Sequence, residues 1–393
     1  MNNVTWRMVL FTPLVLMLGT LVFAQSSERI IRYGDRTFNL QKVAELDLTE
    51  RERRYGPGIR TGSAGEYAVG SAMGGIKVWN LRTGQSRLCA GEANRTYNHI
   101  ALSKNGKFLA GYRNKKIFIW ETSSCRTLKF LEVARDLNLY GLAISSDGKY
   151  LFYAHDDSRF LRSREKLVLW DIERGKEIAD LQPERLPIFG SGYDPLFDKG
   201  ALKPANGSFS PDSRILAVQY SYRIYLWNVE AGTMIRRLVD GSLDYEASQG
   251  GIYDVSFSED GSLLLSRAAD GTVKVWDVQT GDLKQTLRIN DRVHGSASFS
   301  RDNRYVAAGD RKGEISVWEV SSGRMLWKQR LKSYLTLFSS PEVSLISVES
   351  GDIFDVRTGE KIEGIRGEFL SDGRLLKKEK DGNMSIWNVQ RGN

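Results

Sequence analysis

The sequence predicts an all-β fold: a single β-propeller of eight four-stranded blades, with a ring closed by an N-terminal strand. Three observations predict it. An aromatic anchor at the end of a short apolar segment recurs with a mean spacing of about 44 residues. The fifth residue after nearly every anchor is glycine, and a turn rich in Ser, Asp and Gly usually ends 14 or 15 residues before the anchor. A repeat of this length that holds four short strands is typical of a propeller blade.

The anchor and its glycine define the second half of each repeat. Apolar residues alternate with polar ones before the anchor, which predicts a half-buried third strand, and the glycine opens a hairpin into a fourth strand. Cys125 replaces this glycine in the second repeat. The anchors are Trp79, Trp120, Trp170, Trp227, Trp276, Trp318, Phe354 and Trp387, and the glycines are Gly84, Gly175, Gly232, Gly281, Gly323, Gly359 and Gly392.

The order of strands at the two ends of the chain predicts how the ring closes. The eighth repeat reaches its third strand at Trp387 and leaves no length for a fourth. An open blade would expose an unpaired strand edge. Residues 36–42 match the pattern of a fourth strand, so we expect them to complete the last blade. The alternative is a seven-bladed ring, if the weak repeat at 333–360 does not form a full blade.

The repeats resemble the WD-repeat β-propeller family over residues 36–393. The resemblance rests on the anchor tryptophans, on the Ser-Pro-Asp-Gly-like turns and on an Asp or Asn after the anchor. It implies a non-catalytic scaffold for protein–protein contacts. The Gly-His pair of the family is missing from nearly every repeat, and the Asp before the third strand stands clearly only at Asp270 and Asp381, so we expect the family's hydrogen-bonded tetrad to be incomplete. The Asp or Asn positions are Asn80, Asp171, Asn228, Asp277 and Asn388.

The first 24 residues have the composition of a secretory signal peptide. Arg7 is their only charge, residues 8–24 are almost entirely apolar, and Val22 and Ala24 suit a cleavage point before Gln25. We therefore expect a mature propeller of residues 25–393 that is exported, either periplasmic or secreted, and not embedded in a membrane. The alternative is an uncleaved anchor, although Pro13 and Gly19 interrupt an already short apolar run.

Three insertions predict a binding face. They occupy residues 155–166, 183–207 and 241–251, and in a four-stranded blade all three connections leave the ring on the same side. Binding residues favour loops on a rigid scaffold, and aromatic and arginine side chains are enriched in interfaces. The alternative is a cap that packs on itself. The candidate partner-binding residues are Phe160, Arg162, Arg164, Phe189, Tyr193, Asp194, Phe197 and Tyr245.

Chemistry-bearing residues are sparse. The chain has three histidines and two cysteines. We expect His155 in a solvated turn, and His99 and His294 as structural residues near first strands. We expect Cys89 and Cys125 to be free or buried thiols, because the alignment of the repeats places them on opposite sides of the disc. The alternative is a disulfide between them in an oxidising compartment. No nucleophile elbow, phosphate loop or metalloprotease motif is present, so the sequence predicts no enzyme, metal or cofactor.

The leading functional hypothesis is therefore an exported, non-catalytic scaffold with an unidentified protein partner. The net charge of +8 is spread along the chain, which predicts no binding to nucleic acid. One alternative is an enzyme, or a binder of a small ligand or glycan, with a quinoprotein-like or glycan-acting site at the mouth of the central channel. Another is a role in outer-membrane assembly, against which the absence of a lipidation cysteine argues.

Overall fold

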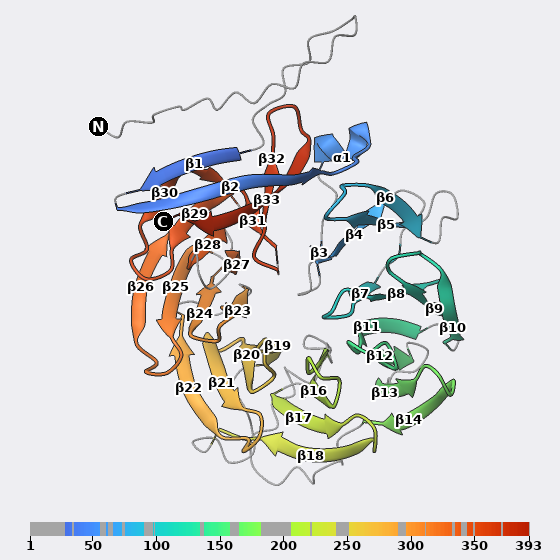
Figure 1. Ribbon diagram of the computed structural model, residues 1–393. Coiled ribbons are helices and arrows are strands. Elements are labelled where there is room, and N and C mark those ends of the chain that lie inside the picture. Colours follow the sequence, from blue (N-terminus) through green and yellow to red (C-terminus); the bar gives the residue numbers. More distant parts are fainter. Residues whose placement is uncertain are drawn as a thin grey trace, which may run out of the picture.

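The computed structural model shows eight antiparallel sheets arranged as a ring (Figure 1), so the predicted eight-bladed propeller is confirmed. The weak repeat at 333–360 supplies the first three strands of a full blade, and Lys361–Arg366 supplies the fourth. The structure describes residues 28–33, 35–55, 60–61, 66–72, 75–89, 97, 99–133, 137–157, 165–181, 206–220, 222–240, 251–289, 296–310, 312–331, 335–338, 344–348, 350–370 and 372–392.

Each of the first four blades is a four-stranded meander. Blade 1 contains β3 (Arg60–Thr61), β4 (Tyr67–Ala72), β5 (Gly75–Asn80) and β6 (Ser86–Cys89); blade 2 contains β7 (His99–Leu102), β8 (Phe108–Arg113), β9 (Lys116–Glu121) and β10 (Thr127–Glu132); blade 3 contains β11 (Leu137–Ile144), β12 (Tyr150–Asp157), β13 (Glu165–Asp171) and β14 (Lys176–Asp180); blade 4 contains β15 (Gly207–Phe209), β16 (Ile215–Tyr220), β17 (Arg223–Asn228) and β18 (Thr233–Leu238).

The next three blades repeat this meander, and the eighth combines the two ends of the described chain. Blade 5 contains β19 (Ile252–Phe257), β20 (Leu263–Ala268), β21 (Thr272–Asp277) and β22 (Leu283–Arg288); blade 6 contains β23 (Ala297–Phe299), β24 (Tyr305–Gly309), β25 (Glu314–Glu319) and β26 (Met325–Arg330); blade 7 contains β27 (Leu335–Phe338), β28 (Leu345–Val348), β29 (Asp352–Asp355) and β30 (Lys361–Arg366); blade 8 contains β31 (Glu368–Phe369), β32 (Leu375–Lys378), β33 (Met384–Arg391), β2 (Arg36–Glu45) and β1 (Glu28–Tyr33).

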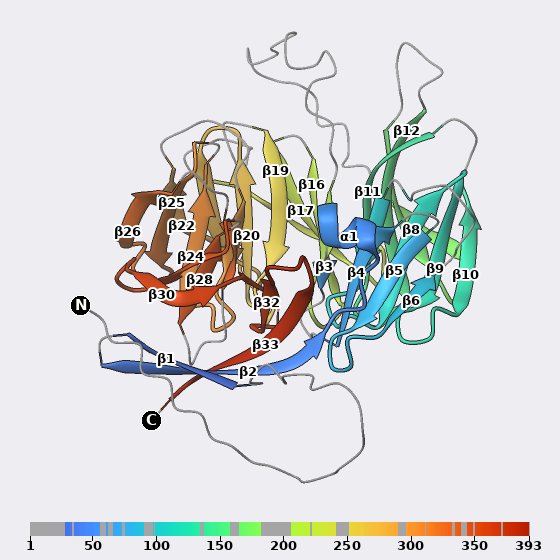
Figure 2. The ribbon, with the colours of Figure 1, turned by 90° about the horizontal axis from the view of Figure 1, so that it is seen from above.

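The ring closes through β2, as the sequence predicts. β2 pairs antiparallel with β33 from Phe38, opposite Arg391, to Glu45, opposite Ser385. Phe38 and Leu40 are buried in the core between blades 7 and 8. The four expected strands of this blade are β31, β32, β33 and β2, and β1 adds a further strand outside β2. Figure 2 shows β1, β2 and β33 running together along one side of the ring.

A short connection ties the closing strand to blade 1. After β2 the chain enters α1 (Glu50–Tyr55), whose start is a capping box: the Thr49 backbone N–H donates to Glu52 Oε2 over 2.8 Å, and the Glu52 N–H donates to Thr49 Oγ1 over 3.3 Å. Lys77 Nζ on β5 donates to the same Glu52 oxygen and to the Asp47 carbonyl, each over 2.8 Å. The Trp79 indole also donates to this carbonyl. The connection is therefore held by buried polar contacts as well as by packing.

A buried ion pair joins the closing strand to blade 7. Arg36 on β2 donates to the carboxylate of Asp355 on β29, and the Asp355 side chain is 3% exposed. Burial alone would raise the pKa of Asp355. The hydrogen bond from Arg36, together with those from the backbone N–H groups of Thr358 and Arg357, instead lowers that pKa. The charged form of Asp355 therefore stabilises the folded ring.

This ion pair predicts a pH-dependent effect of Arg36→Ala. A carboxyl group whose pKa is lowered on folding stabilises the protein above its unfolded pKa of about 3.9, and the stabilisation is lost as the pH falls through the folded pKa. We expect the substitution to reduce the unfolding free energy by roughly 1–3 kcal/mol at pH 7 and by clearly less near pH 3. Urea unfolding at both pH values measures this. Lys42→Ala, which removes an exposed pair with Glu45 on the same strand, is the control; an equal loss at both pH values for Arg36→Ala would contradict the assignment.

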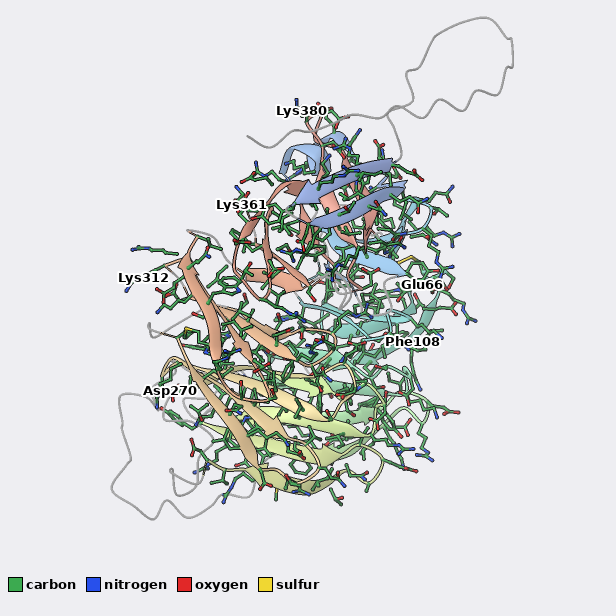
Figure 3. The ribbon with its side chains drawn as sticks, turned by 60° about the vertical axis from the view of Figure 1, so that its left-hand side comes forward. Glu66, Phe108, Asp270, Lys312, Lys361 and Lys380 are labelled. Carbon is green, nitrogen blue, oxygen red and sulfur yellow. A yellow bond between two sulfur atoms is a disulfide. The ribbon has the colours of Figure 1, made fainter. Side chains whose placement is uncertain are left out.

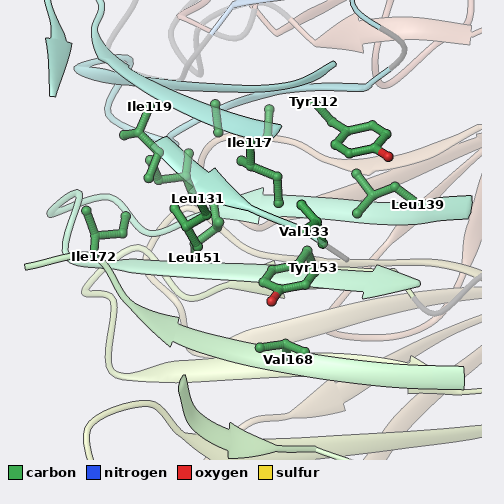
Figure 4. Close-up of a cluster of buried hydrophobic side chains, with 13 residues drawn as sticks. Tyr112, Ile117, Ile119, Leu131, Val133, Leu139, Leu151, Tyr153, Val168 and Ile172 are labelled. Carbon is green, nitrogen blue, oxygen red and sulfur yellow. The ribbon is translucent and has the colours of Figure 1, made fainter. Parts of the chain in front are cut away.

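The core consists of clusters between neighbouring blades. Figure 4 shows one, in which Tyr112, Ile117 and Leu131 of blade 2 pack against Leu151 and Tyr153 of blade 3. The anchors lie on third strands, as predicted, and six of the seven tryptophans are buried while Trp170 is half-buried. Their indole N–H groups find acceptors at different positions in the blade. Trp276 donates to Ser266 Oγ on the second strand over 2.8 Å, whereas Trp387 donates to Ser385 Oγ on its own strand over 2.7 Å. The repeat therefore conserves the position of the tryptophan more closely than its hydrogen bond.

Six of the glycines after the anchors lie against the outer strand of the preceding blade; Gly392 instead lies against Thr37 on β2 of its own blade. At Gly232 an added Cβ would lie 2.7 Å from Ile178 Cγ2, and at Gly281 it would lie 2.8 Å from Arg236 Cδ. Both glycines have positive φ, as does the residue in this position in blade 2, Cys125, at 57°. The glycine thus serves a tight turn and a close contact between blades.

The expectation of two free thiols is wrong, because Cys89 and Cys125 form a disulfide with 5.0 Å between their Cα atoms. Cys89 lies on β6, the outer strand of blade 1, and Cys125 takes the glycine position of blade 2. Aligning the repeats assigns each cysteine to a position within a single blade, and within one blade these two positions lie far apart. The disc brings them together, because the turn after a third strand typically contacts the outer strand of the blade before it, as at Gly232 and Gly281. The disulfide is thus the covalent version of a contact that other blades make with glycine.

Removal of this disulfide should destabilise the ring. The cysteines are 36 residues apart, and closing a loop of that size corresponds to about 3–4 kcal/mol in the chain-entropy model. We expect Cys89→Ser to lose this amount in urea unfolding, and added reductant to have no further effect on the variant. Cys89→Ser/Cys125→Gly should recover about 1 kcal/mol, because glycine adopts positive φ without strain. Unchanged unfolding of the wild-type chain after full reduction would contradict this account.

Candidate interaction faces

The two faces of the ring are built from different connections. The turn face carries the turns between first and second strands and between third and fourth strands. The insertion face carries the connections between second and third strands and between blades. In Figure 3, Asp270, Lys312 and Lys380 lie towards the insertion face, while Phe108 and Glu66 lie towards the turn face.

The turn face repeats one hydrogen-bonded turn in five blades. In blade 2, Ser103 Oγ donates to Asn105 Oδ1 over 2.8 Å and accepts from the Phe108 N–H over 2.9 Å. The side chains thereby replace solvent around a tight turn and fix the start of the second strand. The equivalent pairs are Ser145 with Asp147, Ser210 with Asp212, Ser258 with Asp260 and Ser300 with Asp302, each joined over 2.6–2.7 Å.

Polar contacts on the turn face join blades that are not neighbours in the ring. Lys104 Nζ of blade 2 donates to the Ser258 carbonyl of blade 5 over 2.9 Å and lies 3.5 Å from Glu259 Oε2. Burial lowers the pKa of Lys104, while Glu259 opposes the shift. Arg301 of blade 6 donates to the Asp372 carbonyl of blade 8 over 2.7 Å. The turn face thus uses these side chains internally, to hold its turns together.

The eight candidate partner-binding residues lie outside the described residues. Phe160, Arg162 and Arg164 fall between β12 and β13; Phe189, Tyr193, Asp194 and Phe197 fall between β14 and β15; Tyr245 falls between β18 and β19. The structure describes the strand ends around these segments and no contact of the candidate residues. Their role as a binding surface stays a prediction.

Blade 3 and blade 5 provide the described base of two of the insertions. In blade 3, β11 and β12 are each eight residues long and pair as far as Leu137 and Asp157. His155 lies on β12 with its ring stacked on Tyr153 at 5.9 Å, so the expectation of a solvated turn is wrong. Burial raises the pKa of Tyr153 to about 12. The phenol therefore stays neutral and belongs to the rigid base of the hairpin.

Sequence reasoning missed a buried ion pair and a facing pair of opposite charges beside the insertion of blade 5. Asp240, directly before residues 241–250, accepts from Lys274 Nζ over 2.6 Å, and both side chains are largely buried. Asp254 and Arg267 face each other in the β19–β20 register; desolvation raises the pKa of Asp254 and lowers that of Arg267, and the attraction between the two charges opposes both shifts. The alternation of Lys274 with the valines around it is the signal that could have placed its charge inside the ring.

Potential metal ligands are dispersed over the described residues. Within these ranges no group of three or more His, Cys, Asp or Glu side chains is placed to hold a metal ion. His99 lies on the innermost strand β7, near the ring of Tyr112, as expected of a residue near a first strand; His294 is outside the described residues. No helix among the described residues is long and apolar enough to cross a membrane.

Eight blades of four strands, with β1 added at the edge of blade 8, form a ring closed by the pairing of β2 with β33, and this arrangement is a β-propeller. The family model for the WD domain, G-beta repeat, matches residues 242–277, which cover the start of blade 5 up to its anchor Trp276. This match and the relatives below show a similarity to WD-repeat proteins over part of the chain.

Relatives share the repeats over part of their length. The chain is 26% identical to human apoptotic protease-activating factor 1 over 246 residues, which are 57% of this chain and 19% of that protein. It is 37% identical to WD repeat-containing protein 1 of Xenopus tropicalis over 86 residues, 22% of this chain and 14% of that protein. The chain thus spans less than a fifth of each of these two relatives.

A solved structure resembles the whole ring. The crystal structure of the computationally designed Ika8 protein superposes with a TM-score of 0.59 at 20% identity, and the match covers 88% of this chain and 99% of that one. At this identity the likeness supports the propeller fold alone.

Proposed function

We propose that the chain is an exported, non-catalytic scaffold that binds a protein partner through its insertion face. WD-repeat propellers commonly serve as protein-interaction scaffolds. The observation that carries the proposal is the difference between the two faces. The turn face uses its polar side chains to connect its own turns, whereas all three long segments begin and end at strand ends of the insertion face.

The disulfide supports export. Disulfides persist in oxidising compartments and are rare in the cytosol of most organisms. Cys89 and Cys125 are the only cysteines of the chain, and they are paired. This agrees with residues 1–24 acting as a signal peptide, cleaved before Gln25. Fractionation followed by N-terminal sequencing tests export directly: a cytosolic chain that retains Met1 would contradict it.

Capture of partners by a shortened variant tests the insertion face. The variant replaces residues 183–205 with a short Gly/Ser linker, and the matched control carries Lys107→Ala and Lys149→Ala on exposed positions of the turn face. We expect crosslinking capture from the extracytoplasmic fraction to lose a specific protein with the shortened variant and to retain it with the control. Equal recovery with both variants would remove the case for this face. A thermal shift of the purified chain with metals, quinone cofactors or glycans would contradict a pure scaffold.

A further inference from the structure

The strand β1 forms the outer edge of blade 8. It pairs with β2 through six residue pairs, from Glu28 opposite Gln41 to Tyr33 opposite Arg36, and it ends the order of strands in its sheet. Its side chains alternate between two environments. Arg29 lies 5.2 Å from the ring centre of Trp387, and Ile31 packs on the core between blades 7 and 8. The other set, Glu28, Ile30 and Arg32, is exposed.

The exposed set has an unusual composition for a strand edge. Ile30 is 68% exposed, more than any other large hydrophobic side chain in the described part of the chain. An unpaired edge is a template for another strand, and charged side chains, lysine above all, commonly protect it. Here one acid and one base flank the isoleucine, each two residues away. A second copy of the same strand, running antiparallel, would therefore meet opposite charges rather than like ones.

We propose that β1 pairs antiparallel with β1 of a second copy of this chain, in the register that places Ile30 opposite the partner's Ile30. In this register Glu28 faces the partner's Arg32, and by symmetry Arg32 faces the partner's Glu28. Apolar pairs and pairs of opposite charge directly across two strands stabilise a sheet. The two five-stranded blades become one continuous sheet, and each covers the exposed isoleucine of the other.

Neighbouring registers are disfavoured by the same residues. A shift by one residue in one direction places Arg29 opposite the partner's Arg32, and a shift by two residues in the other direction places Arg29 opposite the partner's Arg29; like charges directly opposite destabilise the pair. The remaining one-residue shift places Arg29 opposite the partner's Ile30 and loses both pairs of opposite charge. The ladder spans five residues, so it buries far less than the roughly 1,200 Å² of a small stable interface. The dimer is accordingly a reversible one, with an expected dissociation constant in the micromolar range or weaker.

Charge reversal on β1 tests the register as well as the dimer. The chain that begins at Gln25 contains all of β1 and is studied by sedimentation velocity over a wide range of concentration at low salt. Arg32→Glu and Glu28→Arg each place like charges opposite each other twice by symmetry, so we expect each to weaken self-association at least about tenfold. The double variant Glu28→Arg/Arg32→Glu restores both pairs and should dimerise like the wild type. Lys107→Glu on the turn face is the control for net charge.

A mixture of the two single variants gives the most specific test of the register. Its result does not depend on comparing the fraction of folded protein between one variant and another. Arg32→Glu chains carry two acids on the edge, and Glu28→Arg chains carry two bases, so a mixed pair is complementary at both positions. We expect heterodimers from two variants that are monomeric alone. A wild-type chain that stays monomeric at the highest concentration it tolerates would overturn the proposal, as would single variants that dimerise unchanged or a mixture that stays monomeric.

Discussion

Deletion of residues 25–45 should unfold the ring at much lower urea concentration than its length suggests. The deletion removes β2 and with it the pairing to β33, the buried side chains of Phe38 and Leu40, and the Arg36–Asp355 pair. Burial of two such apolar side chains contributes roughly 3–6 kcal/mol before any hydrogen bond of the ladder is counted. We expect a loss of at least this size, measured by urea unfolding of the chain that begins at Gln25 and of the truncated chain.

A shorter deletion separates ring closure from the mere loss of residues. Deletion of residues 25–33 removes β1 and leaves β2 in place. We expect it to cost much less, since β1 packs on the rim while β2 completes blade 8. If the longer deletion melts like the intact chain, β2 does not close the ring.

Gly84→Ala should be the most damaging single substitution at a turn of blade 1. Gly84 has φ of +75°, and a Cβ added there would lie 1.8 Å from the Glu45 carbonyl oxygen on the closing strand. This neighbour is backbone and cannot rotate away, so β2 would have to move. The Asp47 N–H, which donates to the Gly84 carbonyl over 2.9 Å, would move with it. We expect a loss of more than about 3 kcal/mol in the free energy of unfolding.

Gly106→Ala is the matched control. Gly106 has nearly the same φ, +73°, and nothing lies within 4 Å of its added Cβ. This substitution should cost only the left-handed backbone strain of about 1–2 kcal/mol. The difference between the two variants in urea unfolding therefore isolates the contact between blades, and equal losses would show that the contact contributes nothing.

Much of the fold follows from local pattern. The anchors and turns recur in the sequence because each blade forms the same strands and the same turns. An added strand was expected at 36–42 because the last repeat lacks a fourth strand. β2 in fact runs from Arg36 to Glu45. The five Ser-x-Asp/Asn turns likewise behave as their residues indicate, with the side chains bonding their own backbone.

Other features depend on contacts between repeats and could not be read from one repeat. The disulfide joins a strand of one blade to a turn of the next, so aligning repeats alone gave the wrong distance. β1 was missed because residues 28–33 match no part of the repeat; they add a strand beyond the fourth. The burial of Lys274 depends on Asp240, which lies in the preceding connection. The insertions do not follow the repeat pattern. Their sequence therefore indicates candidate residues but does not predict how these residues are arranged in space.

Site-specific photo-crosslinking tests the proposed interaction face most directly. A photoreactive amino acid is placed singly at Phe160, Tyr193 or Tyr245 in the insertions, and at Lys107 or Lys149 on the turn face, and each chain is irradiated in its native compartment. The proposal predicts adducts with the same partner from the three insertion positions and none from the two lysine positions. Adducts formed mainly from the turn face, or no adduct from any insertion, would contradict it.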